Sequence, residues 1–324
     1  MRIDSHSFYY AGFAGMSENQ SGIARLNQQI ASGKAYLAPK DDPLATEKIL
    51  QLSNRVAVRS QFSANQDRAA VALKYELTVL TEMRDTLANA RSLIATQSPS
   101  FDSSLRSAHA QNLAALARQV LSLANTRDPA GNYIFGGFDT NDAPFSNPLD
   151  GSATATTYDG TPITSTSDPA GTRDIEVDTG RFVQVNDNLN TVFQATEQTD
   201  AGVAVAGSVV SGSDLLQELD DAVANLPGAT LTQADIDGWV AVIDTALSGL
   251  DGIMHRVSAA YTEVEDVRAT TRSLLLQEKN ALGDIEQVDQ ASAIMELQLR
   301  QTSLEAAQRA YSRTSGLSLF NFLG

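Results

Sequence analysis

The chain has 324 residues, a net charge of −16 and no cysteine. Its length allows two or three domains, and the lack of cysteine excludes disulfides and thiolate chemistry. The three histidines, His6, His109 and His255, lie far apart in the sequence, which indicates surface or core residues rather than metal ligands. No stretch approaches the roughly 18 apolar residues of a membrane-spanning helix, and the first residues contain no apolar run of signal-peptide length. We therefore expect no metal, no cofactor and no membrane partner, and a chain that is cytosolic or exported without a cleavable signal peptide.

The negative charge is concentrated in the middle of the chain. Residues 131–230 contain 15 acidic and two basic side chains, a net charge of −13. This composition does not support a basic nucleic-acid-binding patch, so we expect no nucleic-acid partner. It is typical of a solvated, solubilising domain.

Apolar residues at helical spacing predict three helices before residue 130. The first ends at Gly33, the second at Ser98-Pro99 and the third near Asn125. Their apolar positions are Ile23, Leu26 and Ile30 in the first helix, Leu73, Leu77, Leu80, Leu87 and Ile94 in the second, and Leu105, Leu113, Leu116, Val120 and Leu123 in the third.

The sequence Asp41-Asp42-Pro43 marks the start of a helix. Aspartate is a favourable N-cap residue, and proline is favourable in the first turn of a helix. We therefore interpret Asp42 and Pro43 as a helix cap, and not the paired aspartates as a metal site.

The C-terminal third shows a sustained heptad pattern that starts at Ile243. Fifteen of the twenty a and d positions that follow are apolar, as in a coiled coil. The pattern weakens at Thr271 and Glu278, and three glycines would bend or interrupt a helix, at positions 249, 252 and 283. A continuous helix from Ile243 to Ala306 would span roughly 95 Å. We therefore predict an elongated molecule in which this helix packs against the N-terminal helices.

The segment from Thr140 to about Gly228 is rich in Thr, Ser, Asp, Gly and Pro. Alternating apolar and polar residues at 175–177 and 182–185 predict a β-hairpin with its turn at Asp178–Gly180. We also expect a strand at Ala153–Tyr158 and a short helix near Asp214–Leu226. The neighbouring helices should depend little on this segment.

These patterns predict a mainly α-helical fold with a β-rich insertion. An elongated, coiled-coil-like helical rod is formed from both ends of the chain, and a small outer β-containing domain is looped out. The expected domains are a pair of terminal helices, residues 1–42 with 285–324, a rod domain, 43–138 with 232–284, and a variable acidic β-rich outer domain, 139–231.

Sequence motifs of common enzymes are absent. The chain contains no phosphate-binding GxxxxGK[ST] or GxGxxG, no HExxH and no GxSxG. We therefore expect a protein that is not an enzyme and that has no catalytic residues.

Several segments resemble the bacterial flagellin superfamily. Residues 1–3, 30–34 and 40–45 are similar to the N-terminal part of that superfamily. Residues 124–138, with Tyr-Ile-Phe-Gly-Gly at 133–137, and Ala143-Pro144-Phe145 resemble its hook–filament junction members, as does the ending Gly316-Leu317-Ser318-Leu319-Phe320. The resemblance covers roughly residues 1–145 and 232–324.

The resemblance implies a structural subunit of the bacterial flagellum, which is extracellular and is exported by the flagellar secretion system. It implies a homo-oligomeric ring that contacts the preceding hook-associated protein on the hook side and flagellin on the filament side. It further implies a dedicated export chaperone that binds the C-terminal helix. Two alternatives remain at this point, namely filament flagellin and a secreted or cytosolic coiled-coil interaction protein. A flagellin with an inserted protease would require a metal motif such as HExxH, which is absent.

Amphipathic faces at the two ends of the chain are the candidate assembly interface. An isolated pair of such helices is marginally stable in water without a packed partner. We therefore expect both ends to be disordered in the monomer and to fold together on assembly. The interface residues are Ile3, Phe8, Phe13, Ile23, Leu26 and Ile30 at the N-terminal end, and Ile285, Val288, Met295, Leu299, Leu317, Leu319 and Phe320 at the C-terminal end.

Overall fold

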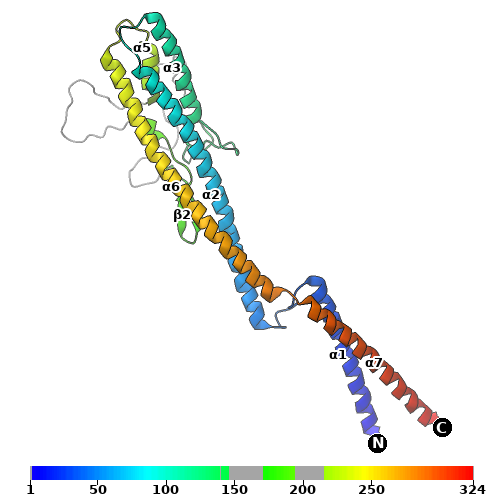
Figure 1. The fold of residues 1–324 in the computed structure, drawn as a ribbon. Helices are drawn as coiled ribbons and strands as arrows, with labels where there is room; N and C mark the ends of the chain where they lie inside the picture. The colour runs from blue at the N-terminus through cyan, green and yellow to red at the C-terminus, as the bar shows by residue number, and fades with distance from the viewer. Residues whose placement is uncertain (1, 139, 146–170, 194–214, 324) are drawn as a thin grey trace. The chain divides into compact units, whose positions relative to one another are not determined.

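The computed structural model describes residues 2–138, 140–145, 171–193 and 215–323 (Figure 1). Within these ranges it describes the side chains of all residues except 2–9, 190, 191 and 314–323. In chain order, the elements are α1 (Arg2–Ser32), α2 (Pro43–Ala95), α3 (Ser103–Ala124), β1 (Asp174–Asp178), β2 (Arg181–Gln184), α4 (Asn190–Phe193), α5 (Leu215–Asn225), α6 (Gln233–Glu286) and α7 (Gln290–Leu323).

The predicted fold class, mainly helical with a small β-containing insertion, is confirmed. The three N-terminal helices end close to the predicted positions, and the hairpin and the short helix before residue 226 are present. The strand expected at 153–158 lies outside the described residues.

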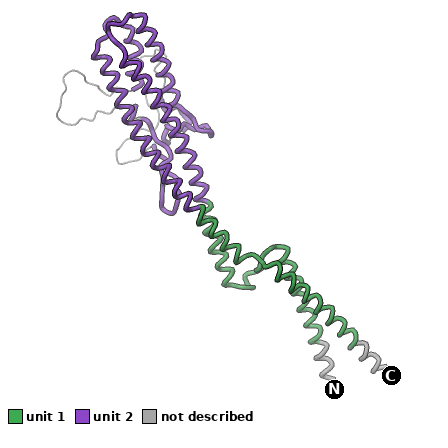
Figure 2. Tube along the Cα trace, viewed as in Figure 1, with its two compact units in different colours: residues 1–60, 272–324 green, residues 61–271 purple. Residues whose placement is uncertain are grey.

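The chain divides into two compact units, shown in Figure 2. The first unit contains residues 1–60 and 272–324, and the second contains residues 61–271. The division into three domains that we infer from the sequence stays a prediction.

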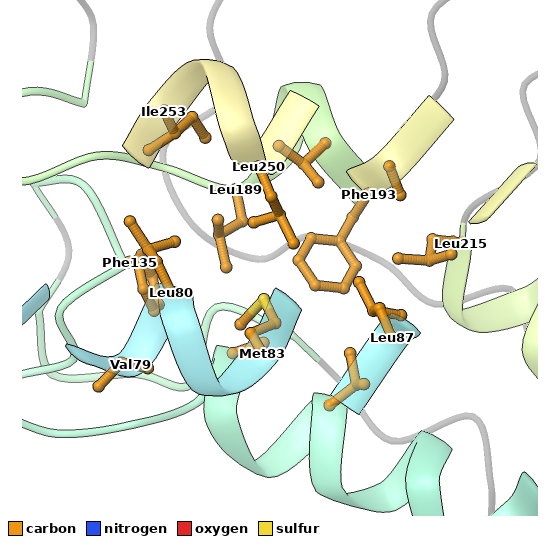
Figure 3. Close-up of a cluster of buried hydrophobic side chains, with 14 of the residues drawn as sticks. Val79, Leu80, Met83, Leu87, Phe135, Leu189, Phe193, Leu215, Leu250 and Ile253 are labelled. Carbon is orange, nitrogen blue, oxygen red and sulfur yellow. The ribbon is translucent and has the colours of Figure 1, made fainter. Parts of the chain in front are cut away.

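One hydrophobic core in the second unit joins side chains from the five helices α2 to α6, from both strands of the hairpin and from connecting segments, and Figure 3 shows part of it. Each of the labelled residues is at most 5% exposed. They are Val79, Leu80, Met83 and Leu87 of α2, Leu250 and Ile253 of α6, Phe193 of α4, Leu215 of α5, and Phe135 and Leu189 of the connecting segments. Burial of a large apolar side chain contributes roughly 1.5–3 kcal/mol, so this cluster is the main source of stability in the unit.

The β-hairpin is part of this core. β1 and β2 pair antiparallel, with Ile175 opposite Val183 and Glu176 opposite Phe182. Val183 faces the core, whereas Phe182, its neighbour on the strand, is 63% exposed. The expectation that the helices depend little on the insertion is therefore wrong for the hairpin, α4 and α5, since their apolar side chains complete the helical core.

Polar residues occupy the two positions at which the predicted heptad pattern of α6 weakens. Thr271 and Glu278 are both buried, and each finds a polar partner on α2. In the second unit, buried Gln66 donates to Thr271 Oγ1 at 2.9 Å. In the first unit, Arg55 and Arg59 each form a 2.8 Å ion pair with Glu278. Because a polar group in a helical seam needs a matched partner, these pairs define the register of α6 against α2.

The C-terminal helical segment is interrupted between α6 and α7, close to Gly283, one of the three glycines at which the sequence suggests a bend or a break. Residues 286–288 pair with 33–35, through hydrogen bonds of 2.8 Å from Ala35 N to the Glu286 carbonyl and 3.0 Å from Val288 N to the Gly33 carbonyl. Asp289 then begins α7 by accepting hydrogen bonds from Ala291 N at 3.0 Å and Ser292 Oγ at 2.7 Å. Backbone pairing between distant segments therefore ends one helix, and a new cap starts the next.

The segment before α2 is ordered by two adjacent aspartates with different roles. Asp42 lies directly before Pro43, and its Oδ1 accepts a hydrogen bond from Ala45 N at 3.0 Å, which is the geometry of an N-cap. Asp41 instead accepts hydrogen bonds from Leu37 N and Ala38 N, both at 3.1 Å. Desolvation of the Asp41 carboxylate acts to raise its pKa. The two hydrogen bonds and the nearby Arg25 outweigh this effect, so the pKa of Asp41 is lowered.

Phenylalanines at positions 193 and 182 provide a matched test of this fold. Phe193 is 1% exposed and packs against the ring of Phe145, with ring centroids 4.8 Å apart. We expect Phe193→Ala to lower the free energy of unfolding by about 3–5 kcal/mol, because it leaves a cavity in the core. Phe182→Ala, the control, should change it by less than about 0.5 kcal/mol. The chain has a single tryptophan, Trp239, which is 7% exposed, so its fluorescence in a denaturant titration reports unfolding of this unit. Equal effects of the two substitutions would show that the insertion is not part of the core.

Candidate assembly surface

Helices α1 and α7 pack side by side in the first unit, but few of their described apolar side chains are buried between them. Of the apolar side chains described in these two helices, only Leu26 and Ala293 are buried. Gly22 and Arg300 lie at a close approach, since a Cβ atom at Gly22 would come within 2.5 Å of the Arg300 guanidinium. The pair therefore has little of the core that stabilises a helix in water.

The face of α7 that contacts α1 differs from the face predicted by the heptad pattern. The predicted a and d positions of α7, residues 292, 295, 299, 302, 306 and 309, are all exposed. The buried or half-buried positions are instead Ala293, Leu297, Arg300, Leu304 and Ala307. The interruption at 287–289 gives α7 a new rotational register, so the pattern of α6 does not continue into it. The capping sequence Asp289-x-x-Ser292 is the signal by which this change could have been found.

Three large apolar side chains of these helices are directed away from the helix pair. Phe13 of α1 is 66% exposed, and Met295 and Leu299 of α7 are 64% and 70% exposed. We call these three residues the outer apolar residues. Residues 295 and 299 are four apart and therefore lie on one face of α7. Apolar side chains that are exposed to water contribute to stability only when another surface covers them.

The other residues of the predicted interface divide into two groups. Ile23, Ile30, Ile285 and Val288 are half-buried and Leu26 is buried, so in the monomer these residues already contact the chain itself. The side chains of Ile3, Phe8, Leu317, Leu319 and Phe320 lie outside the described residues. The cap residues Asp42 and Pro43 lie at the start of α2, as described above.

Among the described residues, there is no group of three or more His, Cys, Asp or Glu side chains that could hold a metal ion. No described helix combines the length and apolar character that crossing a membrane requires.

Comparison with known proteins finds proteins that are similar to this chain. Residues 8–140 match the bacterial flagellin N-terminal helical region. Flagellar hook-associated protein 3 of Escherichia coli strain K12 is 26% identical over 331 aligned residues, which cover 99% of each chain.

Two solved structures, both from Legionella pneumophila, share the fold. Flagellar hook-associated protein-3 has a TM-score of 0.59 at 17% identity and covers 73% of this chain and 98% of that one. The flagellar junction protein FlgL has a TM-score of 0.56 at 17% identity and covers 74% of this chain and 99% of that one. The N-terminal part of the protein is therefore similar to that of bacterial flagellins, and nearly its whole length is similar to flagellar hook-associated protein 3.

Proposed function

We propose that this protein is a structural, non-enzymatic subunit that joins hook to filament in the bacterial flagellum. It leaves the cell unfolded through the flagellar secretion system and assembles as a ring. The preceding hook-associated protein contacts one side of the ring, and flagellin contacts the other. The full-length similarity to hook-associated protein 3 supports this placement.

The observation that carries the proposal is the exposure of the outer apolar residues Phe13, Met295 and Leu299. Each would gain roughly 1.5–3 kcal/mol on full burial, and the monomer does not supply that burial. Neighbouring subunits in a ring supply it at these three residues. The exposed face of α7 also offers a binding surface to an export chaperone before assembly.

The terminal helices fold on docking, because the monomer stabilises them only weakly. Leu26 and Ala293 are their only buried apolar residues among the described side chains. Two helices with so few buried contacts do not offset the conformational entropy lost on ordering them. Disorder before assembly also suits passage through a narrow channel.

Immunogold labelling of isolated flagella tests the position of the protein. We expect label only at the boundary between hook and filament, because a junction subunit is present there and nowhere else along the structure. Label distributed along the whole filament would contradict the proposal and favour filament flagellin.

A substitution at Leu299 tests the outer apolar residues. Leu299→Asp places a charge on a surface that must be desolvated in the ring, so filaments should be lost. Because Leu299 is 70% exposed in the monomer, the melting temperature of the purified protein should not change. The measurement is electron microscopy of cells that express only the variant, with the protein in the medium quantified to verify export. Gln301→Asp is the control, since Gln301 is also exposed on α7 but on a different side. Normal filaments with Leu299→Asp would exclude this face from the interface.

Limited proteolysis of the purified monomer tests whether the ends fold on docking. We expect both ends to be removed rapidly and a stable fragment of roughly residues 45–280 to remain, because cleavage follows local unfolding. Mass spectrometry of the fragment defines its ends. Termini as resistant as the second unit would show that the helix pair is folded on its own, as in a self-contained coiled-coil protein.

A further inference from the structure

Glu76 is a buried carboxyl group of the second unit, on the side of α2 that contacts the segment after β2. It is 2% exposed, and it forms part of the wall of a hole beside α2 with a volume of about 510 Å³. Its Oε1 accepts a hydrogen bond from Asp187 N at 2.9 Å. Its Oε2 is buried and has no hydrogen-bond partner in the described part of the chain. One oxygen of this carboxyl group is therefore unmatched.

Asp187 lies next to Glu76, but the charge of Asp187 is balanced. Asp187 is 4% exposed, and its Oδ1 pairs with the guanidinium of Arg256 on α6. Gln184 Nε2 donates a second hydrogen bond to the same oxygen, at 2.9 Å. Because Arg256 already neutralises Asp187, it leaves no full positive charge for Glu76. The two neighbouring carboxyl groups thus share a single arginine that is bound to one of them.

The charged groups that line the hole do not compensate Glu76 either. Asp67 has an ion pair with α6 at 2.5 Å, and Asp128 accepts hydrogen bonds from two backbone N–H groups, both at 2.9 Å. Arg68 is exposed, and Arg173 acts on both Asp128 and Glu76 without an ion pair to either. The lining contains three carboxyl groups and two arginines, so its charges balance only when Glu76 is neutral.

This environment favours the protonated form of Glu76. Burial, followed by the Asp187 carboxylate, raises the pKa of Glu76 well above its usual range. The hydrogen bond from Asp187 N and the positive charges of Arg256 and Arg173 act in the opposite direction and are weaker. A protonated carboxyl group still accepts the hydrogen bond from Asp187 N, and it places an O–H rather than a charge in the interior.

The segment that Glu76 contacts, residues 186–188, connects several parts of the second unit. Asn186 Nδ2 donates to the carbonyls of Gly171 at 3.2 Å and Gly137 at 3.4 Å. The segment follows closely after β2, and Leu189, directly beyond it, is fully buried in the core. A movement of this segment away from α2 would therefore disturb the hairpin and the core next to it.

We propose that Glu76 is a proton-dependent latch, which holds residues 186–188 and the hairpin before them on α2 while it is protonated and loosens them when it ionises. An ionised Oε2 requires hydrogen-bond donors that the protein does not provide. Water supplies these donors only when residues 186–188 move away from α2. In the extracellular location, which rests on the proposed function, the latch makes the second unit respond to the pH of the surroundings.

The latch makes the second unit less stable as the pH rises. The pKa of glutamate in an unfolded chain is about 4.3, so above this value folded Glu76 holds a proton that the unfolded chain has lost. Between about pH 4.3 and the raised pKa of folded Glu76, the ratio of unfolded to folded protein increases by up to about tenfold per pH unit. Burial also raises the pKa values of Asp187 and Asp220, which contribute in the same direction.

Denaturant titrations at about pH 5 and about pH 8 test the latch, with Trp239 fluorescence of the full-length protein as the readout. We expect the natural protein to be less stable at the higher pH. Glu76→Gln should lose most of this difference, because an amide accepts the same hydrogen bond without ionising. Glu82→Gln, which changes an exposed glutamate of α2, is the control and should keep the natural pH dependence. Equal pH dependence of the natural protein and Glu76→Gln would overturn the proposal.

Hydrogen exchange of the natural protein provides an independent measurement that requires no variant. After correction for the pH dependence of exchange in an unfolded chain, peptides from residues 174–189 should exchange several-fold faster at about pH 8 than at about pH 5. Peptides from the buried start of α6, residues 236–250, should change less. No change in residues 174–189, or an equal change in both regions, would refute a local latch even if Glu76→Gln does not fold.

Both measurements use the purified protein, so they separate the latch from the proposed function. A latch that fails these tests leaves the location at the junction of hook and filament intact. Immunogold label outside that junction would contradict the proposed function and leave the measured latch unchanged.

Discussion

Burial of apolar side chains in the second unit is the interaction on which the rest of the structure depends. Helices α2 and α6 contribute residues such as Leu80 and Leu250, both fully buried, and the hairpin, α4 and α5 close the core around them. Because this burial occurs within one copy, the second unit does not require neighbours for its stability.

The terminal helices, unlike the second unit, leave several of their large apolar side chains exposed. Large apolar residues are present, but Phe13, Met295 and Leu299 remain mostly in water. Apolar side chains that gather on one exposed face are typical of an interaction surface. The proposed function therefore assigns stability to the second unit and contacts between subunits to the terminal helices.

Polar contacts between α2 and α6 specify alignment more than they stabilise it. Arg84 and Asp251 form a 2.7 Å pair, but both side chains are more than 40% exposed, and such a pair contributes at most about 1 kcal/mol. Buried Gln66 differs, since a change of register would leave its amide without partners in the core. Its second hydrogen bond, to Val177, fixes the hairpin and thereby the position of Phe182.

Much of the secondary structure could be predicted from the sequence, because it depends on local spacing. Helical periodicity, the cap at Asp42 and the turn at Asp178–Gly180 each involve residues that are near neighbours in the chain, as does the seam of α6. The same periodicity extended wrongly into α7. It could not show that residues 33–35 pair with 286–288 and end α6, since that pairing joins segments about 250 residues apart.

Only the tertiary structure decided which of the predicted interface residues face outward. Leu26 is buried against the neighbouring helix whereas Leu299 is exposed, although both have the same spacing pattern in the sequence. The hole beside α2 likewise joins side chains from α2, the loop after α3 and residues beyond β2. Burial depends on which distant segments meet in space, and local periodicity carries no information about that choice.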